Sequence, residues 1–212
     1  MTGKCRGWLA TLRASMLDPR SFCYFESFLT PGAANRLLSI FWHELQWSRQ
    51  EIVLFGKNVM QPRLTAWYGD PGTSYTYSGL RQEPLPWHPQ LQALRQRLQE
   101  HCDAEFNSVL ANAYRDGSDS MGWHSDDEPE LGDEPLIASI SLGAQRAFLV
   151  RPRAKPPRGK RISEKLSPAS GSLLLMRGAS QRRYQHAVPK TRREVGLRIN
   201  LTYRMVKTQP PA

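Results

Sequence analysis

The feature that most constrains the fold of this chain is a series of short apolar runs, each of strand length, in its second half. Gly, Pro, Ser and Asp residues separate the runs, and no helix-length segment lies between them. Many short strands without intervening helices predict an antiparallel sandwich or jelly roll, in a mainly β chain with flanking helices (α+β). The runs are 108–114, 136–142, 146–151, 171–176, 184–188 and 196–204.

Two segments in the first half have helical spacing instead. Thr30 and Pro31 supply N-terminal capping chemistry, and apolar residues then recur at helical spacing as far as Leu45. Pro89 opens a second segment, in which apolar residues recur every three or four positions as far as Cys102. We expect both amphipathic helices to support the predicted strands.

The length of 212 residues fits one domain. We expect this domain over 21–206, an N-terminal extension over 1–20 and a tail over 207–212. No apolar run approaches the roughly 18 residues that a membrane span needs, so neither a membrane anchor nor a secretory signal is expected. Three widely spaced cysteines argue against a disulfide framework. We therefore expect an intracellular protein, located in the cytoplasm, or in the nucleus of a eukaryote.

Positive charge is concentrated in the last third of the chain. Residues 1–144 contain 12 Lys and Arg against 17 Asp and Glu, whereas residues 145–212 contain 17 against 2. Such a concentration favours a polyanionic partner and salt-sensitive binding. A solvated basic surface is the alternative. Because Arg outnumbers Lys here and aromatic residues lie nearby, we favour nucleic acid.

Three residues form a candidate metal site. His124 and Asp126 are two positions apart, so on extended backbone their side chains point to the same side. His186, in another strand-like run, is the best candidate for a third ligand. Two histidines and one carboxylate form the facial triad of non-haem Fe(II) sites, which leaves positions open for substrate and oxygen. Taken alone, a His two residues before an Asp is more often a surface pair.

The run 196–204 alternates between polar and apolar residues. Arg198 and Arg204 lie about 20 Å apart along such a strand, and their side chains could lean inward to hold a short dicarboxylate. An outward-facing polar strand has the same periodicity. The polar face also carries Asn200 and Thr202, and the apolar face consists of Leu197, Ile199, Leu201 and Tyr203.

Together these residues resemble the AlkB family of Fe(II)- and 2-oxoglutarate-dependent dioxygenases, in particular the AlkB homologues that repair alkylated duplex DNA. The similarity covers about 54–206 and includes Asn112-Ala113-Tyr114, which resembles the NxY segment of the family. The resemblance implies a double-stranded β-helix, or jelly roll, with an N-terminal nucleotide-recognition lid over about 48–88. It also implies Fe(II), 2-oxoglutarate as co-substrate, and O2.

The resemblance further assigns roles to individual residues. His124, Asp126 and His186 would bind iron, while Arg198 and Arg204 would hold the distal and metal-side carboxylates of 2-oxoglutarate. The remaining residues of the 2-oxoglutarate pocket would be Asn112, Tyr114, Asn200 and Thr202.

Substrate contacts follow from the same resemblance. Phe55, beside Gly56 and Lys57, resembles the aromatic wedge that fills the gap left by a flipped base, although a buried Phe in a hairpin is the ordinary interpretation. Tyr75, Thr76 and Tyr77 would line the lesion pocket, and core-covering strand aromatics are the alternative. Asp127 and Glu128 would accept a hydrogen bond from the damaged base and fix the local hairpin. The expected phosphate contacts are Lys57, Arg63, Arg158, Lys160, Arg161, Lys190, Arg192 and Arg193.

The sequence thus predicts a monomeric DNA repair enzyme. It would remove methyl groups from 1-methyladenine and 3-methylcytosine in double-stranded and also single-stranded DNA, releasing formaldehyde and succinate. Two departures from the family pattern weaken the duplex preference: Thr191 replaces an expected basic residue, and the loop 152–168 is rich in proline. The alternatives are the same chemistry on RNA, tRNA or protein, and a noncatalytic nucleic-acid-binding jelly roll.

Overall fold

Two antiparallel sheets face each other in the computed structural model, which describes residues 18–49, 51–54, 57–73, 75–77 and 80–207. The six-stranded sheet has the order β1 (Phe22–Phe25), β12 (Ser172–Met176), β9 (Ile137–Gly143), β14 (Arg198–Arg204), β7 (Ser108–Tyr114), β4 (Leu64–Gly69). The four-stranded sheet has the order β11 (Glu164–Leu166), β10 (Phe148–Pro152), β13 (Tyr184–Val188), β8 (Met121–His124). This arrangement confirms the predicted jelly roll.

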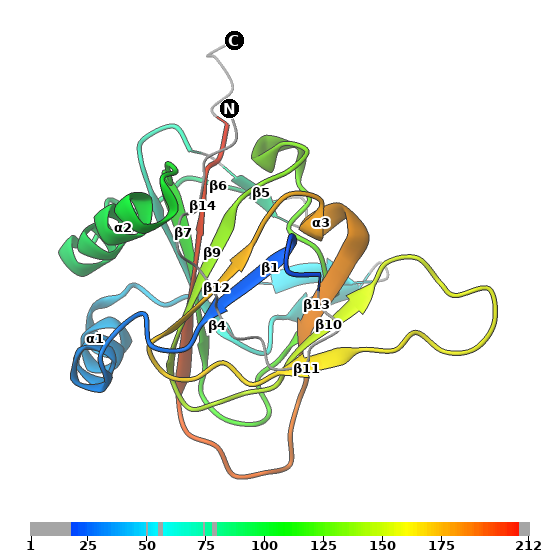
Figure 1. Cartoon of the computed structure of the whole chain (residues 1–212). Coiled ribbons are helices and arrows are strands. Elements are labelled where there is room, and N and C mark those ends of the chain that lie inside the picture. Colours follow the sequence, from blue (N-terminus) through cyan, green and yellow to red (C-terminus); the bar gives the residue numbers. More distant parts are fainter. Residues whose placement is uncertain (1–17, 50, 55–56, 74, 78–79, 208–212) are drawn as a thin grey trace.

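Two helices cover the outer face of the six-stranded sheet (Figure 1), namely α1 (Pro31–Glu44) and α2 (Pro89–Cys102). Thr30 caps α1 by accepting a hydrogen bond from the amide of Ala33, and His88 caps α2 by accepting one from the amide of Gln90. Each helix buries one apolar stripe against the sheet, and together these residues form the larger core. Its members include Leu37, Phe41, Leu91, Leu94, Leu98, Ala111, Ile199, Leu201 and Tyr203.

A second core lies between the two sheets. Its members come from both of them, among them Phe22, Tyr114, Ile137, Phe148, Val150, Leu174, Met176 and Val188. β14 separates the two cores, because its apolar residues face the helices and its polar residues face the other sheet. All seven of its residues are buried. The polar face of 196–204 is therefore not an outward-facing surface.

Shorter elements complete the chain. Two hairpins follow α1, one made of β2 (Glu51–Leu54) and β3 (Lys57–Met60), the other of β5 (Tyr75–Tyr77) and β6 (Leu80–Gln82). A 3-10 turn, η1 (Pro129–Leu131), follows β8, and a single helical turn, α3 (Ser180–Arg183), precedes β13. Among the described residues, no helix is both long enough and apolar enough to cross a membrane.

The predicted strands agree closely with the observed ones. β7 and β13 have the predicted bounds, and the other predicted strands differ by one or two residues at an end. The strands β1, β4, β6, β8 and β11 and the turns η1 and α3 were not predicted. The basic, Pro-rich segment 152–168 forms the connection of the β10–β11 hairpin and extends away from the sheets (Figure 1).

Candidate active site

The three candidate metal ligands are brought together by one pair of strands. His124 is the last residue of β8, and it lies opposite His186 of β13 in the register of the sheet. Their ring centroids are 4.1 Å apart. Asp126 lies two residues beyond the end of β8, where its backbone amide donates a hydrogen bond of 3.0 Å to Oε1 of Gln181. Strand pairing across some 60 residues thus places two histidines and a carboxylate at one point.

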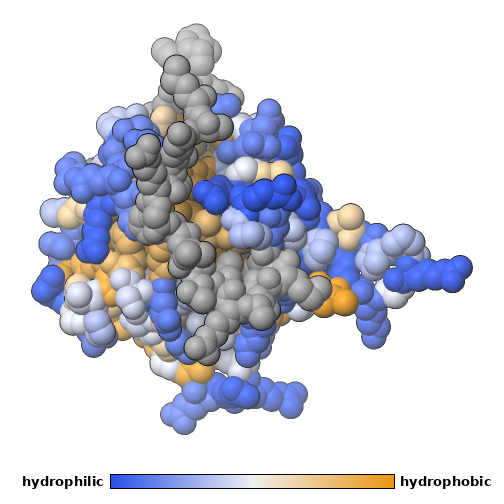
Figure 2. Space-filling model, viewed as in Figure 1, coloured by the Kyte–Doolittle hydropathy of each residue, from blue (hydrophilic) through white to orange (hydrophobic). Residues whose placement is uncertain are grey.

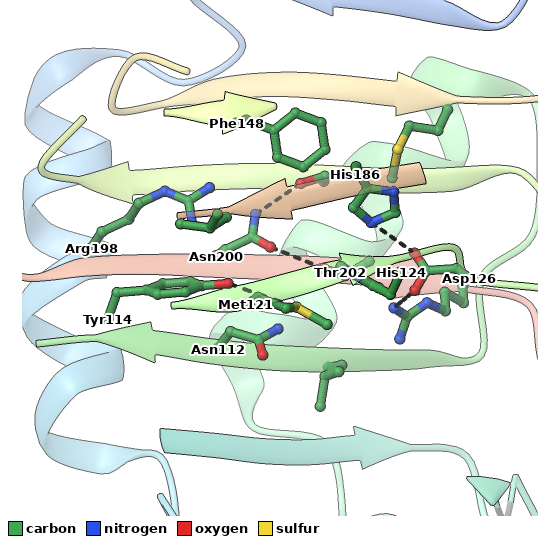
Figure 3. Close-up of a pocket in the computed structure, with 15 residues that line it drawn as sticks. Asn112, Tyr114, Met121, His124, Asp126, Phe148, His186, Arg198, Asn200 and Thr202 are labelled. Atoms are coloured by element: carbon green, nitrogen blue, oxygen red, sulfur yellow. Dashed lines mark hydrogen bonds and ion pairs between the residues drawn. The ribbon is translucent and has the colours of Figure 1, made fainter. Parts of the chain in front are cut away.

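The geometry of this group fits a metal ion. One ligand atom from each residue lies within 4.8 Å of the others, and His186 Nε2 is 4.0 Å from Asp126 Oδ2 (Figure 3). His124 Nδ1 donates to the carbonyl of Gly122 at 2.9 Å, which leaves its Nε2 free to bind a metal. Phe148 stacks on the His186 ring at 5.2 Å and fixes its orientation.

The charge states of the three residues suit metal binding as well. Burial lowers the pKa of His124, and burial together with repulsion from His124 lowers the pKa of His186 to about 3. Both imidazoles are therefore neutral at physiological pH. Burial alone would raise the pKa of Asp126, but the charge of Arg204 and its hydrogen bond to the carboxylate hold this pKa below its usual value. Two neutral imidazoles and one carboxylate are the donor set of a facial Fe(II) site.

Arg198 lies at the far end of the same cavity from Asp126 (Figure 3). It is 2% exposed, Nη2 donates to Ser141 Oγ at 3.1 Å, and its guanidinium lies 5.1 Å from the centre of the Tyr114 ring. Nε and Nη1 are buried without a hydrogen-bond partner among the described residues. A buried cation with free donors fits the carboxylate of a bound dicarboxylate, because an Arg fork pairs with both of its oxygens.

Arg204 lies at the metal end of the cavity. Its Nη2 donates to Asp126 Oδ1 at 2.7 Å, so it orients the candidate metal ligand. Between the two arginines, Asn200 donates to Ser139 Oγ at 2.8 Å and accepts from the Thr202 hydroxyl at 3.1 Å. The structure therefore gathers the predicted triad and the polar face of β14 in one enclosed space.

Arg63 is buried next to Asn112. The side chain is 4% exposed, and its Nε donates to Asn112 Oδ1 at 2.7 Å. In the structure Arg63 fixes the side chain of Asn112, which lines the cavity. Its contact with the DNA backbone stays a prediction.

The predicted substrate contacts lie on several separate segments. Phe55 and Gly56 fall outside the described residues. Lys57 begins β3, and Tyr75, Thr76 and Tyr77 form β5. Asp127 forms an ion pair with Arg153, and Glu128 precedes η1. The predicted phosphate contacts of the C-terminal third occupy two loops: Arg158, Lys160 and Arg161 lie between β10 and β11, and Lys190, Arg192 and Arg193 lie between β13 and β14.

Sequence analysis missed several residues that build the cavity. Ser139 and Ser141 on β9 hold Asn200 and Arg198, and the alternation of these serines with Ala138, Ile140 and Leu142 was a readable signal of an inward polar face. Nothing in the sequence marks Gln181 or Phe148, since their contacts depend on the packing of distant segments.

Comparisons with known proteins agree with this site. The 2OG-Fe(II) oxygenase superfamily model matches residues 21–204. The chain is 40% identical to human alpha-ketoglutarate-dependent dioxygenase alkB homolog 3 over 195 residues, which are 89% of this chain and 67% of that protein. It is also 40% identical to the human DNA oxidative demethylase ALKBH2, over 92% of this chain and 76% of that protein.

Solved structures share the fold at lower identity. A 2OG-Fe(II) oxygenase family oxidoreductase from Burkholderia pseudomallei aligns with a TM-score of 0.58 at 14% identity, over 90% of this chain and 89% of the other. OsALKBH1 aligns with a TM-score of 0.55 at 17% identity, over 88% and 97% of the two chains. The family model, which spans both sheets, and the His-Asp-His group together show that this chain belongs to the 2OG-Fe(II) oxygenase superfamily.

Proposed function

We propose that this protein is a dioxygenase that oxidatively demethylates alkylated DNA bases, such as 1-methyladenine and 3-methylcytosine, and so repairs DNA by direct reversal. The observation that carries the proposal is the triad of His124, Asp126 and His186 in one cavity with the unpaired donors of Arg198. The two human relatives named above, one of them called a DNA oxidative demethylase, support DNA as the substrate.

In this proposal the chain positions its cofactors and excludes water. His124, Asp126 and His186 would hold Fe(II). Arg198 binds the distal carboxylate of 2-oxoglutarate, and Arg204 keeps Asp126 ionised and aligned. Bound Fe(II) and 2-oxoglutarate supply the activation of O2. Overall, one oxygen atom ends in succinate, CO2 is released, and the other oxygen enters the N-methyl group, which then leaves as formaldehyde.

DNA recognition is assigned to the surroundings of the cavity. The hairpins β2–β3 and β5–β6 form the nucleotide-recognition lid within 48–88, with Phe55 as wedge and Tyr75, Thr76 and Tyr77 on the lesion. Asp127 and Glu128 lie directly after the metal ligand and contact the base, while the two basic loops contact phosphates. The enzyme acts as a monomer, within the cell, on double-stranded and also single-stranded DNA.

Mass spectrometry of oligonucleotides that carry one 3-methylcytosine tests the proposal. Duplex and single-stranded copies, and an RNA copy, are incubated with the protein, Fe(II), ascorbate and 2-oxoglutarate. We expect loss of the methyl mass from DNA only when 2-oxoglutarate is present. Asp126→Ala should abolish this loss, whereas Asp133→Ala, an exposed acid of the same loop region, should not. Retained turnover in Asp126→Ala, or turnover of RNA alone, would contradict the proposal.

A further inference from the structure

A second cavity, of about 510 Å3, lies beneath the loop that connects β10 to β11. Its volume is within the range of small-molecule pockets, which is about 300–1,000 Å3. It is separate from the cavity of the triad, with which it shares no lining residue. The residues that line it come from β10, β13 and the loop, and include Val150, Pro152, Lys155, Arg158, Lys160, Arg161, Ile162, Glu164 and Tyr184.

This loop cavity adjoins the metal site along one face of the four-stranded sheet. Tyr184 is two residues before His186 on β13, and alternate residues of a strand point to the same face. On the neighbouring strand, Pro152 lies opposite Tyr184 and Val150 lies opposite His186. The loop cavity therefore begins about 7 Å along the strand from a metal ligand, the length of two residues.

The walls of the loop cavity are apolar and partly aromatic. Val150 is 2% exposed, and the Tyr184 ring packs edge-on against Phe22 at 5.2 Å, which fixes its plane. Ile162 is 71% exposed, more than any other large hydrophobic residue that the structure describes. An aliphatic side chain held in the open, next to a fixed aromatic ring, offers a contact surface for a flat apolar group.

The rim of the loop cavity is cationic. It carries Lys155, Arg158, Lys160 and Arg161 against one acid, Glu164, and none of the four cations has an ion-pair partner in the part of the chain that the structure describes. In contrast, the nearby arginines 153, 182 and 183 are each paired with a carboxylate. Arg161 Nε is also buried without a hydrogen-bond partner there. Figure 2 shows hydrophilic residues at the projecting tip of the loop.

We infer that the loop cavity is a subsite for one unpaired nucleotide of the strand that carries the methylated base. Its base would lie against Tyr184 and Ile162, and its phosphate on the cations of the rim. A flat apolar ring joined to an anion satisfies both the walls and the rim, whereas a stacked duplex presents phosphates alone. The inference rests on DNA being the substrate. Because every base has a flat ring that can stack, we expect the affinity to be nearly the same for any base in the subsite.

An abasic-site scan tests the subsite. Single-stranded oligonucleotides with one 3-methylcytosine and one abasic position, moved stepwise to either side, are bound under nitrogen to the full-length protein with Fe(II) and 2-oxoglutarate. We expect Kd to rise about tenfold at one neighbouring position and little at the others, which is the usual size of one base–aromatic contact. Turnover is measured separately in air, so binding and chemistry are read independently.

Variants identify the cavity as the cause. Ile162→Ser and Tyr184→Leu should each weaken binding of the intact oligonucleotide. In these variants the abasic substitution at the sensitive position should no longer raise Kd, because the contact that it removes is already lost. Met205→Ser, which removes another exposed apolar side chain, should bind as the unaltered protein does.

The outcomes separate the subsite from the proposed function. A flat scan, or unchanged binding by Ile162→Ser, overturns the subsite even where demethylation proceeds. A flat scan in which Arg158→Ala still lowers affinity and salt dependence would mean that the loop holds phosphate only, and this also overturns it. One sensitive position without any loss of methyl groups would uphold the subsite and overturn DNA demethylation.

Discussion

At the scale of single residues, Arg198 connects the fold to the chemistry most directly. It is a buried cation with two unpaired nitrogens, so a dicarboxylate gains charge-assisted hydrogen bonds there. Arg198→Lys keeps the charge but loses the planar fork, and we expect KM for 2-oxoglutarate to rise about tenfold or more. Release of CO2 at varied 2-oxoglutarate measures this change. Arg115→Lys, at a half-exposed ion pair outside the cavity, is the matched control, and an unchanged KM in Arg198→Lys would refute the assignment.

Gln181 contacts the backbone of the candidate metal ligand Asp126. It is 2% exposed, and its Oε1 accepts the backbone amide hydrogen bond of Asp126. Gln181→Leu has a similar volume but cannot accept this bond, so the ligand loop loosens, and we expect Fe(II) affinity to fall about tenfold. Calorimetric titration under nitrogen gives the affinity. Gln185→Leu, on the outer part of β13, should leave it unchanged, and equal losses in both variants would point to a general effect of removing an amide.

At the scale of elements, Gly143 is the last residue of β9 and lies opposite Arg198 of β14. Its φ is +80°, and a Cβ there would lie 2.3 Å from the carbonyl oxygen of Leu197. Gly143→Ala therefore combines an unfavourable left-handed conformation with a backbone clash, and we expect the free energy of unfolding to fall by about 2 kcal/mol or more. Denaturant unfolding measures the difference. Gly196→Ala, where a Cβ meets nothing within 4 Å, should cost less than half as much.

Sequence patterns predicted those elements in which the spacing of apolar residues matches the face that packs against the core. The alternation of 198–204 predicted β14, and the cap Thr30 and the first-turn Pro89 marked the starts of the two helices. β1, β8 and β11 have only three or four residues, which is too short for a period to be seen. The burial of Arg63 could not be predicted either, because it depends on the pairing of β4 with β7.

The candidate site was predictable to the extent that its members lie on one strand or within a short motif. Strand periodicity predicts that His124 and Asp126 share a side, but the choice of His186 and the roles of the arginines depended on family resemblance. The pairing of His186 with His124 is a property of sheet register, and no local pattern encodes it. The same holds for Phe148 and Gln181, which reach the site from other elements.

At the scale of the whole molecule, cofactor binding should stabilise the fold. The ligands come from segments far apart in the chain, and a ligand that binds only the folded state at 100 times its Kd adds about 2.7 kcal/mol. For a domain of this size we expect the melting temperature to rise by about 5–10 °C. Calorimetry under nitrogen with Fe(II) and 2-oxoglutarate measures the rise, and a chelator should reverse it. A rise of the same size in Asp126→Ala would contradict the proposed metal site.

The place of β14 between the two cores also limits how this lineage can diverge. The strand is buried on both sides, and its inward face carries Arg198 and Arg204. A descendant that no longer bound a dicarboxylate would retain Arg198 as a buried cation without its anion, at a cost to folding. We therefore expect inactive descendants that keep the jelly roll to have replaced Arg198 with an apolar residue. The residue at position 198 would then indicate, from a gene sequence alone, whether a jelly roll of this family still binds its co-substrate.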